Sequence, residues 1–248
     1  MNAIVVQVRM GSTRLPGKVL KPFFKAKTIL DIVVENAQKN KFGWEVIVAT
    51  TSQQIDDEIE IFCNSRKIKC FRGSENDVLK RFMDTALQYK IEKMIRVCAD
   101  NPFLNTQLID ALIEGSINNS NSDYISHFTS DGMPSIKTHW GVFAEFVTYN
   151  ALCKVYELTN ELFYQEHVTN YIYANPQSFK IVQLEMPIWM RETTNIRFTV
   201  DTPDDFSTMV NLYSKFYPTF NLEKIVEFVK TQPEILAIMD RNINQFKK

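Results

Sequence analysis

The stretch AIVVQVRMGSTRLPGK, from Ala3 to Lys18, joins an apolar run to a loop that carries three cations. Ala3 to Val8 is continuous and rich in β-branched residues, which is the pattern of a strand covered on both faces. Arg9, Arg14 and Lys18 follow between two glycines and a proline. A turn uses glycine and proline, but it does not need three cations within ten residues. The stretch predicts a buried strand followed by a loop whose charge requires an explanation.

Strand and helix patterns alternate through the first half of the chain. This repetition predicts an α/β fold with a mostly parallel sheet, right-handed crossovers and helices wrapped around it. Ligands of such sheets bind outside the carboxyl ends of the strands, so the polar residues that follow the strands should meet at one edge. Strands are expected at 3–8, 45–50, 69–71 and 93–99, and helices at 28–39, 53–66, 76–89 and 106–117.

The pattern changes between residues 129 and 191, where short mixed segments and several aromatic residues replace the alternation. We interpret this region as an inserted lid within a single domain that spans residues 1–248. The alternation then resumes, and the tail is interrupted near Pro233. The other expected elements are strands at 123–126 and 196–200, helices at 148–158 and 164–174, a helix that begins near Pro203, and two closing helices between 221 and 246.

Composition places the chain among ordinary globular proteins with a sizeable core. Of its 248 residues, 45% are hydrophobic and 23% are charged, and the net charge is −1. This charge gives no reason to expect binding to nucleic acid or to a membrane, and no stretch reaches the ~20 apolar residues of a membrane helix. The four cysteines and three histidines lack metal-binding spacings, and no signal peptide is visible. We expect a cytoplasmic protein with reduced thiols.

The loop after the first strand has the composition of a phosphate-binding site. Gly11 and Gly17 permit backbone conformations that aim successive N–H groups into one concavity. Arg14 and Lys18 add the positive charge that a polyphosphate requires. The loop is neither a Walker A motif nor a dinucleotide motif, because it matches neither GxxxxGK[ST] nor GxGxxG. A solvated basic turn remains the alternative.

Two aspartates occupy matching positions at the ends of predicted strands. Asp100 ends the run MIRVCAD and precedes Asn-Pro, whereas Asp201 ends the run IRFTVD and precedes Thr-Pro-Asp-Asp. Mg²⁺ takes hard oxygen ligands, usually one or two carboxylates with substrate phosphates and water. The shared edge with the basic loop favours a magnesium site. The alternative for Asp100 is an ordinary turn or helix-capping residue. The alternative for Asp201 is capping of the helix that follows, with Thr202 as a competing cap.

A third polar cluster lies in FRGSENDVLKRF, between a short strand and a helix. Arg72, Ser74, Glu75, Asn76 and Asp77 carry side chains that could hydrogen-bond the edge of a nucleotide base. Ser74 or Asn76 could instead cap the helix, because short polar side chains readily bond nearby backbone N–H groups. The segment therefore has two interpretations, base recognition and capping, which can coexist on different residues.

Five motifs occur in an order that resembles the cytidylyltransferases: RMGSTRLPGK, FRGSENDVLKRF, CADNPF, QEHVTNYIYANPQSFKI and RFTVDTPDD. Together they span nearly the whole chain, so the set is far more specific than any single motif. The chain looks most similar to the spore-coat-polysaccharide-type enzymes, and it is more distantly similar to the synthetases of CMP-3-deoxy-manno-octulosonate and CMP-sialic acids. The resemblance implies a nucleotidyltransferase with a Rossmann-like, glycosyltransferase-A-like sheet.

The resemblance also implies roles for individual residues, and it implies that residues 129–191 supply the acceptor pocket and a homodimer contact. The residues expected to bind the nucleotide are Arg9, Met10, Gly11, Ser12, Arg14, Lys18, Arg72, Ser74 and Asp77. The residues expected to be catalytic are Arg14, Lys18, Asp100 and Asp201, of which the two aspartates would hold Mg²⁺. The candidate acceptor-binding residues are Glu145, His167 and Arg197.

The implied reaction is attack of an acceptor hydroxyl on the α-phosphorus of CTP, which releases pyrophosphate and forms a CMP-linked sugar or sugar acid for surface polysaccharide. The alternatives are an enzyme that makes a diphosphate-linked product from a phosphorylated sugar or polyol, and a catalytically silent nucleotide-binding protein. Ala99 and Asn101 stand where the better-known synthetases carry a glycine and a second acidic residue. Residues 136–146 match the sugar-acid synthetases poorly, so the sequence leaves the acceptor open.

Overall fold

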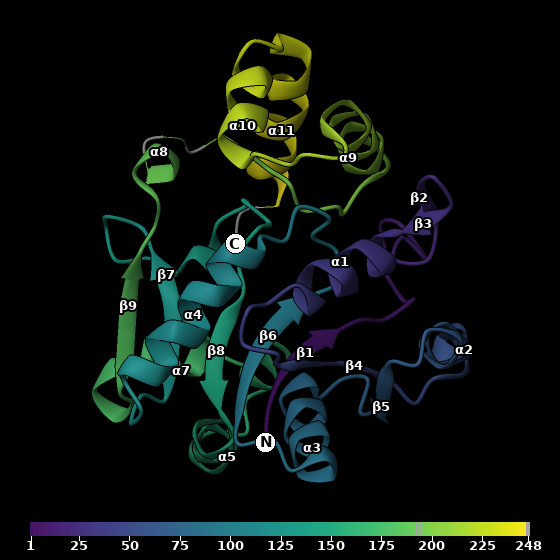
Figure 1. Cartoon of the computed structure of the whole chain (residues 1–248). Helices are drawn as coiled ribbons and strands as arrows, with labels where there is room; N and C mark the ends of the chain where they lie inside the picture. Colours follow the sequence, from purple (N-terminus) through teal and green to yellow (C-terminus); the bar gives the residue numbers. More distant parts are fainter. Residues whose placement is uncertain (192, 194, 247–248) are drawn as a thin grey trace.

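The predicted first strand, β1 (Asn2–Gln7), lies in the middle of a seven-stranded sheet in the computed structural model, which describes residues 1–191, 193 and 195–246 (Figure 1). Its residues Ala3 to Val6 are fully buried, as expected for a strand covered on both faces. In order across the sheet, the strands are β5 (Lys69–Gly73), β4 (Glu45–Thr51), β1, β6 (Lys93–Cys98), β8 (Glu145–Thr148), β7 (Tyr124–Phe128) and β9 (Ile181–Glu185).

The four strands β5, β4, β1 and β6 pair in parallel, so their carboxyl ends lie at one edge of the sheet. Gln7, at the end of β1, is level with Ala49 of β4 and with Cys98 of β6. The chain segments that follow these strands therefore emerge side by side. This confirms the predicted α/β architecture in the first half of the chain.

The second half of the sheet contains two strands that the sequence analysis did not predict. The strand β8 runs antiparallel between β6 and β7, and β9 runs parallel to β7 at the edge (Figure 1). Both come from residues 129–191, so this segment forms part of the main sheet. The strand β8 was missed because it continues directly into α5 (Tyr149–Leu158), and its short apolar run has no alternation of its own.

Helices cover both faces of the sheet. The buried side chains of α1, α2 and α4 pack on one face, and those of α3, α5 and α7 pack on the other. None of the helices in the described part of the chain is long and apolar enough to cross a membrane. The helices on the two faces are α1 (Ile29–Gln38), α2 (Asp57–Ser65), α3 (Val78–Tyr89), α4 (Thr106–Asn118), α5 and α7 (Asn170–Ala174).

Three closing helices gather beyond the end toward which β6 points, at the top of Figure 1. They are α9 (Pro203–Phe216), α10 (Leu222–Lys230) and α11 (Pro233–Gln245), which confirms the predicted helix from Pro203 and the break near Pro233. The single helix expected at 164–174 is wrong, because it is two short helices, α6 (Leu162–Glu166) and α7, separated at His167–Thr169. The remaining short elements are β2 (Pro22–Phe24), β3 (Lys27–Thr28) and α8 (Ile188–Arg191).

The strand predicted at residues 196–200 is also wrong. These described residues are extended but belong to no strand. They are fixed by separate hydrogen bonds, from the Val200 N–H to the Asp100 carbonyl at 3.0 Å and from the Phe198 N–H to the His139 carbonyl at 3.2 Å. The apolar alternation that suggested a strand reflects burial of Ile196, Phe198 and Val200 beneath the closing helices. The segment nevertheless delivers Asp201 to the carboxyl edge.

Candidate active site

A large cavity opens at the carboxyl edge of the sheet, on the face that carries α3 and α7. Its volume is about 1240 Å³, and its walls come from the ends of β1 and β6, the start of α3, the turn η2 (Ser135–Lys137), α6 and α7. The structure thus brings the basic loop and both strand-end aspartates into one cavity. Of the residues predicted from the sequence, those that line it are Arg9, Ser12, Arg14, Lys18, Glu75, Asn76, Asp100, His167 and Asp201.

The ammonium group of Lys18 lies between the two strand-end aspartates. Its Nζ is 3.1 Å from Asp100 Oδ2 and 3.1 Å from Asp201 Oδ1, and it donates to the Val200 carbonyl at 2.5 Å. Burial alone would lower the pKa of Lys18, but the charges of Asp100 and Asp201 raise it above its usual value. The lysine is therefore fully charged, and three oxygen atoms surround a single buried cation.

Three cations surround the carboxylate of Asp201 and lower its pKa. Burial alone would raise its pKa, but the charges of Lys18, Arg197 and Arg14 outweigh burial and lower the pKa to about 2. Arg14 reaches Asp201 Oδ1 from the open side at 3.0 Å, whereas Arg197 reaches Oδ2 from the buried side at 2.7 Å. The carboxylate stays ionised across the physiological pH range.

These ion pairs account for two of the three cations of the basic loop. Lys18 pairs with both strand-end aspartates and Arg14 pairs with Asp201. The charges of Lys18 and Arg14 are therefore balanced by carboxylates of the protein itself.

The backbone of the basic loop is held in shape by a buried aspartate that the sequence analysis missed. Asp56, which is 1% exposed, accepts a hydrogen bond from the Met10 N–H at 2.7 Å and another from the Thr51 N–H at 3.3 Å. The Met10 carbonyl accepts from the Gly17 N–H at 3.0 Å, which closes the loop. Gly17 has a φ of +68°, a conformation that glycine adopts without strain. Gly11 does not use this region, contrary to expectation.

Asp201 is positioned by a buried scaffold rather than by a capping role. Arg197, which is 1% exposed, bonds Asp201 and also donates from Nε to Asp205 Oδ1 at 3.0 Å. Asp205 in turn accepts from the Asp201 and Thr202 N–H groups, at 2.9 Å each. Thr202 and Asp205 form the capping box of α9, and Asn105 caps α4. Neither strand-end aspartate is a helix cap, so the structure removes the capping alternative for both, although Asp100 does lie in a turn.

The segment from Arg72 to Asp77 uses most of its polar groups locally. Arg72 donates to the carbonyls of Thr51 and Gln53 and pairs with two carboxylates near α2. Asp77 is the N-cap of α3, and Ser74 accepts from the Asp77 N–H at 3.0 Å. Within this segment the residues that line the cavity are Glu75 and Asn76. The role in base recognition predicted for Arg72, Ser74 and Asp77 remains a prediction.

Two arginines that the sequence analysis did not select line the cavity. Arg81, on the first turns of α3, is 2% exposed and donates to the carbonyls of Ser74 at 2.5 Å and Glu75 at 3.5 Å. Burial, together with the nearby charge of Arg9, lowers its pKa to about 10. Arg96, in β6, lines the cavity and pairs with Glu145 at 2.5 Å. The signal that could have found them is an arginine at an otherwise apolar, buried position of a helix or strand.

Two of the three candidate acceptor-binding residues do not reach the cavity surface. Glu145 is fully buried, where it accepts hydrogen bonds from Arg96, Tyr124 and Thr169, and Arg197 lies behind Asp201. A buried charge survives only when it is paired and hydrogen-bonded, so both residues organise the cavity from below. His167 is exposed at the cavity wall beside α6. His167 therefore lies where it could contact an acceptor, and that contact remains a prediction.

The other two histidines have buried, structural surroundings. His127, in β7, is 3% exposed and packs on the ring of Phe143, and burial lowers its pKa to about 4. It is therefore neutral at physiological pH. The His139 Nδ1 lies 2.7 Å from Arg197 Nη1 and accepts its hydrogen bond, since a guanidinium can only donate. His139 thus belongs to the scaffold of Asp201.

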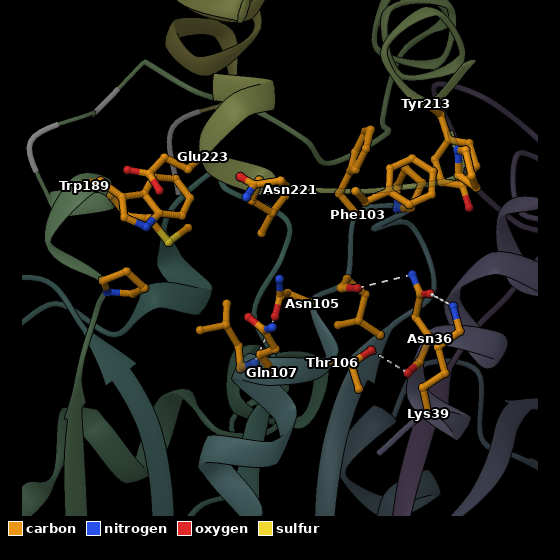
Figure 2. A pocket seen from close by; sticks show the side chains of 18 residues that line it. Asn36, Lys39, Phe103, Asn105, Thr106, Gln107, Trp189, Tyr213, Asn221 and Glu223 are labelled. Atoms are coloured by element: carbon orange, nitrogen blue, oxygen red, sulfur yellow. Dashed lines mark hydrogen bonds between the residues drawn. The ribbon is translucent and has the colours of Figure 1, made fainter. Parts of the chain in front are cut away.

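A second cavity, of about 480 Å³, is lined by the segment that follows Asp100 and by residues at the start of α10 (Figure 2). Phe103, Trp189 and Tyr213 give it an aromatic wall, and Asn105 and Asn221 face it from the starts of α4 and α10. It contains neither a carboxylate pair nor a cluster of cations among its described lining residues. The chemistry predicted from the sequence is confined to the larger cavity.

The oxygen atoms around Lys18 suit a hard cation. Asp100, Asp201 and the Val200 carbonyl already surround a positive charge, and carboxylate and carbonyl oxygens are the ligands that Mg²⁺ prefers. No group of three or more His, Cys, Asp or Glu side chains gathers as a metal site in the described ranges 1–191, 193 and 195–246. Two carboxylates are enough for a magnesium ion that also binds substrate phosphates.

The chain is similar to known proteins over nearly its whole length. An uncharacterized protein of Methanocaldococcus jannaschii is 36% identical over 97% of this chain and 95% of its own length. The spore coat polysaccharide biosynthesis protein SpsF of Bacillus subtilis is 33% identical over 94% of this chain and 97% of its own length. The structure of a cytidylyltransferase from Leptospira borgpetersenii shares the fold with a TM-score of 0.83, at 29% identity, and covers 95% of this chain and 96% of that one. A family model described as Cytidylyltransferase matches residues 3–238, so the chain belongs to the cytidylyltransferase family.

Proposed function

We propose that the protein transfers CMP from CTP to a hydroxyl group of a small sugar or sugar-acid acceptor, with Mg²⁺ as cofactor and with release of pyrophosphate. The observation that carries the proposal is the buried ammonium of Lys18 held between two strand-end carboxylates at the edge of a 1240 Å³ cavity. This arrangement supplies both a cation site and phosphate-binding cations at the position where α/β sheets bind ligands.

The basic loop would bind the triphosphate. Lys18 and Arg14 are paired with carboxylates of the protein, and phosphate oxygens could replace those carboxylates as partners. Arg14 is 43% exposed along its side chain and faces the cavity, so its planar guanidinium can bind two phosphate oxygens at once. Lys18 contributes a mobile point charge. Together they would neutralise the departing pyrophosphate, which is where negative charge develops.

Asp100 and Asp201 would hold the magnesium ion, with the Val200 carbonyl close to both. When bound, such an ion polarises phosphate oxygens and lowers the pKa of the attacking hydroxyl. The scaffold of Arg197 and Asp205 keeps the Asp201 carboxylate ionised and fixed in orientation. In this proposal the protein contributes position and charge, and no covalent intermediate is required.

Different lining residues of the cavity suit different parts of the reactants. Glu75, Asn76 and Arg81, at the start of α3, carry polar groups that could bind a cytosine edge. Ser135, Thr138 and Asn170 carry hydroxyl and amide groups that suit a polyhydroxylated acceptor. The kinship with a spore coat polysaccharide biosynthesis protein supports a sugar-like acceptor for surface polysaccharide.

We also propose a cytoplasmic homodimer. Helix α6 presents Leu162 and Phe163 to solvent, 78% and 54% exposed, beside the cavity mouth. Exposed apolar residues that are close together suit a contact with a second copy of the chain. Light scattering of the protein and of the double variant Leu162→Ser/Phe163→Ser tests this. A monomeric parent protein would contradict it.

The test of the proposed function is CTP-dependent release of pyrophosphate. The protein is incubated with CTP, Mg²⁺ and a panel of sugar acids, aminated nonulosonic acids and phosphorylated polyols, and the products are identified by mass. A single phosphate bridge in the product is expected, whereas a diphosphate bridge would identify the alternative enzyme. The double variant Asp100→Asn/Asp201→Asn serves as the inactive control. If calorimetry detects no binding of CTP with Mg²⁺, the proposal is wrong.

A further inference from the structure

The end of the last described helix, α11, lies beside the candidate active site. The ring of Phe246, which follows α11, lies against the guanidinium of Arg14, whose Cζ is 4.2 Å from the ring centroid. The Cζ of Arg197 lies 5.8 Å from the same centroid. Arg14 and Arg197 each bind one oxygen of Asp201. Phe246 therefore lies against two of the three cations that hold the Asp201 carboxylate, the third being Lys18.

The position of α11 is fixed by the loop that carries Asp201. Asn242, which is 3% exposed, donates to Asp205 Oδ1 at 2.9 Å and to Thr202 Oγ1 at 3.2 Å. Met239, one turn earlier, is 1% exposed in the core. These contacts connect α11 to the same scaffold that positions Asp201. The placement of Phe246 over Arg14 is thus coupled to the geometry of the site rather than to a loose tail.

Arg14 needs such a support more than the other cations of the site. Lys18 is held by three oxygen atoms and Arg197 is fully buried, whereas the side chain of Arg14 is 43% exposed and has one carboxylate partner among the described residues. A long exposed side chain samples many rotamers, and ordering it opposes binding. An aromatic ring against the face of a guanidinium attracts it and leaves its N–H groups free at the edge.

We infer that Phe246 is a positioning residue for Arg14, and that α11 is thereby part of the nucleotide site. The ring holds the guanidinium plane so that its edge faces Asp201 in the free protein and the phosphates when nucleotide is bound. The inference rests on the proposed function for the second of these partners. The first partner, Asp201, does not depend on it.

The experiment compares two substitutions of one ring. Phe246→Leu keeps an apolar side chain without an aromatic face, whereas Phe246→Tyr keeps the face. Calorimetry with CTP and Mg²⁺ should show binding weakened by about two- to fivefold in Phe246→Leu and unchanged in Phe246→Tyr. In an Arg14→Ala background, Phe246→Leu should have no further effect. Arg241→Ala is the matched control on the same helix, because it removes only an exposed ion pair with Asp204.

A second measurement does not depend on nucleotide. Phenylglyoxal labels accessible guanidinium groups, and the rate at Arg14 can be followed by peptide mass in the nucleotide-free protein. Labelling of Arg14 should be about two- to fivefold faster in Phe246→Leu than in the parent or in Phe246→Tyr. Equal labelling rates in all three proteins would overturn the inference. A parent protein that binds no CTP would contradict the proposed function alone, since the labelling still decides the role of Phe246.

Discussion

The basic loop and the segment from Arg72 to Asp77 look alike in sequence but use their polar groups differently. Both follow a parallel strand, and both carry arginine beside small polar residues. In the basic loop, Lys18 bonds Asp100 and Asp201, which are 82 and 183 residues away. In the other segment, Arg72, Ser74 and Asp77 bond groups within 21 residues.

The distance in sequence between hydrogen-bond partners distinguishes residues that stabilise local structure from residues that form a ligand site. Bonds to neighbours in sequence fix a turn or start a helix, and they form wherever short polar residues precede a helix. A buried cation that bonds two distant carboxylates stabilises no local element, and it requires desolvation of all three charges. We interpret this desolvation cost as a sign that the three charges bind a ligand. The comparison predicts that mutations in the basic loop affect catalysis, while those of the capping residues affect stability.

The largest effect is expected at the two carboxylates. Asp100→Asn and Asp201→Asn should each reduce turnover on the order of 10²-fold or more, because each removes charge from the proposed cation site. Steady-state pyrophosphate release at several Mg²⁺ concentrations measures this. Asp204→Asn is the control, since Asp204 is an exposed neighbour paired with Arg241. Near-normal turnover in either variant would show that the carboxylate holds no metal.

Arg14 should show the next largest effect. Arg14→Ala should raise KM for CTP and lower kcat, with kcat/KM reduced on the order of tenfold or more, because charge builds on the leaving pyrophosphate. Arg14→Lys should recover only part of the loss, since a point charge replaces a planar fork. Initial-rate kinetics with varied CTP decides between these outcomes. A variant Arg14→Ala with parental kcat and KM would mean that the loop is only a basic turn.

A substitution of Lys18 tests whether its ammonium group occupies the position of the proposed metal ion. Lys18→Met removes the ammonium and keeps much of the stem, so the nucleotide-free protein should bind Mn²⁺ on the order of tenfold more tightly than the parent. Electron paramagnetic resonance of added Mn²⁺ gives the affinity directly. Lys21→Met, at an exposed lysine three residues after Lys18, should leave the Mn²⁺ affinity unchanged. Unchanged Mn²⁺ affinity in Lys18→Met would separate the ammonium from the metal position.

The smallest effect is expected in the capping segment. Asp77→Ala removes the N-cap of α3 and should cost about 1 kcal/mol of unfolding free energy, with no change in the preference for CTP over UTP. Asn76→Ala, at the neighbouring position that lines the cavity, should reduce that preference by about fivefold with little loss of stability. Denaturant unfolding and competition binding measure the two properties separately. The reverse assignment would show that the caps read the base.

The parallel half of the fold was predictable because each of its strands is a continuous apolar run with a helix pattern behind it. The antiparallel strand β8 was not, since four residues that enter α5 without a turn carry no period of their own. The apolar residues at 196–200 misled for the opposite reason. Their burial comes from the closing helices, and a sequence pattern records burial without recording which backbone partners produce it.

The candidate site divides in the same way. Lys18, Asp100 and Asp201 could be selected because cations and carboxylates at strand ends carry a chemical signal of their own. Asp56 and Phe246 could not, because an acidic residue before a helix and a phenylalanine after one are common in any protein. Only their three-dimensional neighbours, the Met10 N–H and the Arg14 guanidinium, give them a role.

The ammonium between Asp100 and Asp201 would also set an order of events for the proposed reaction. Lys18 bonds both carboxylates, so it would compete with divalent ions for them, including transition ions that bind carboxylates more strongly than magnesium does. A triphosphate that drew the lysine away would make the carboxylates available. The ion would then arrive already chelated by the nucleotide, so the supply of CTP, rather than that of free metal, would determine when the catalytic centre is assembled.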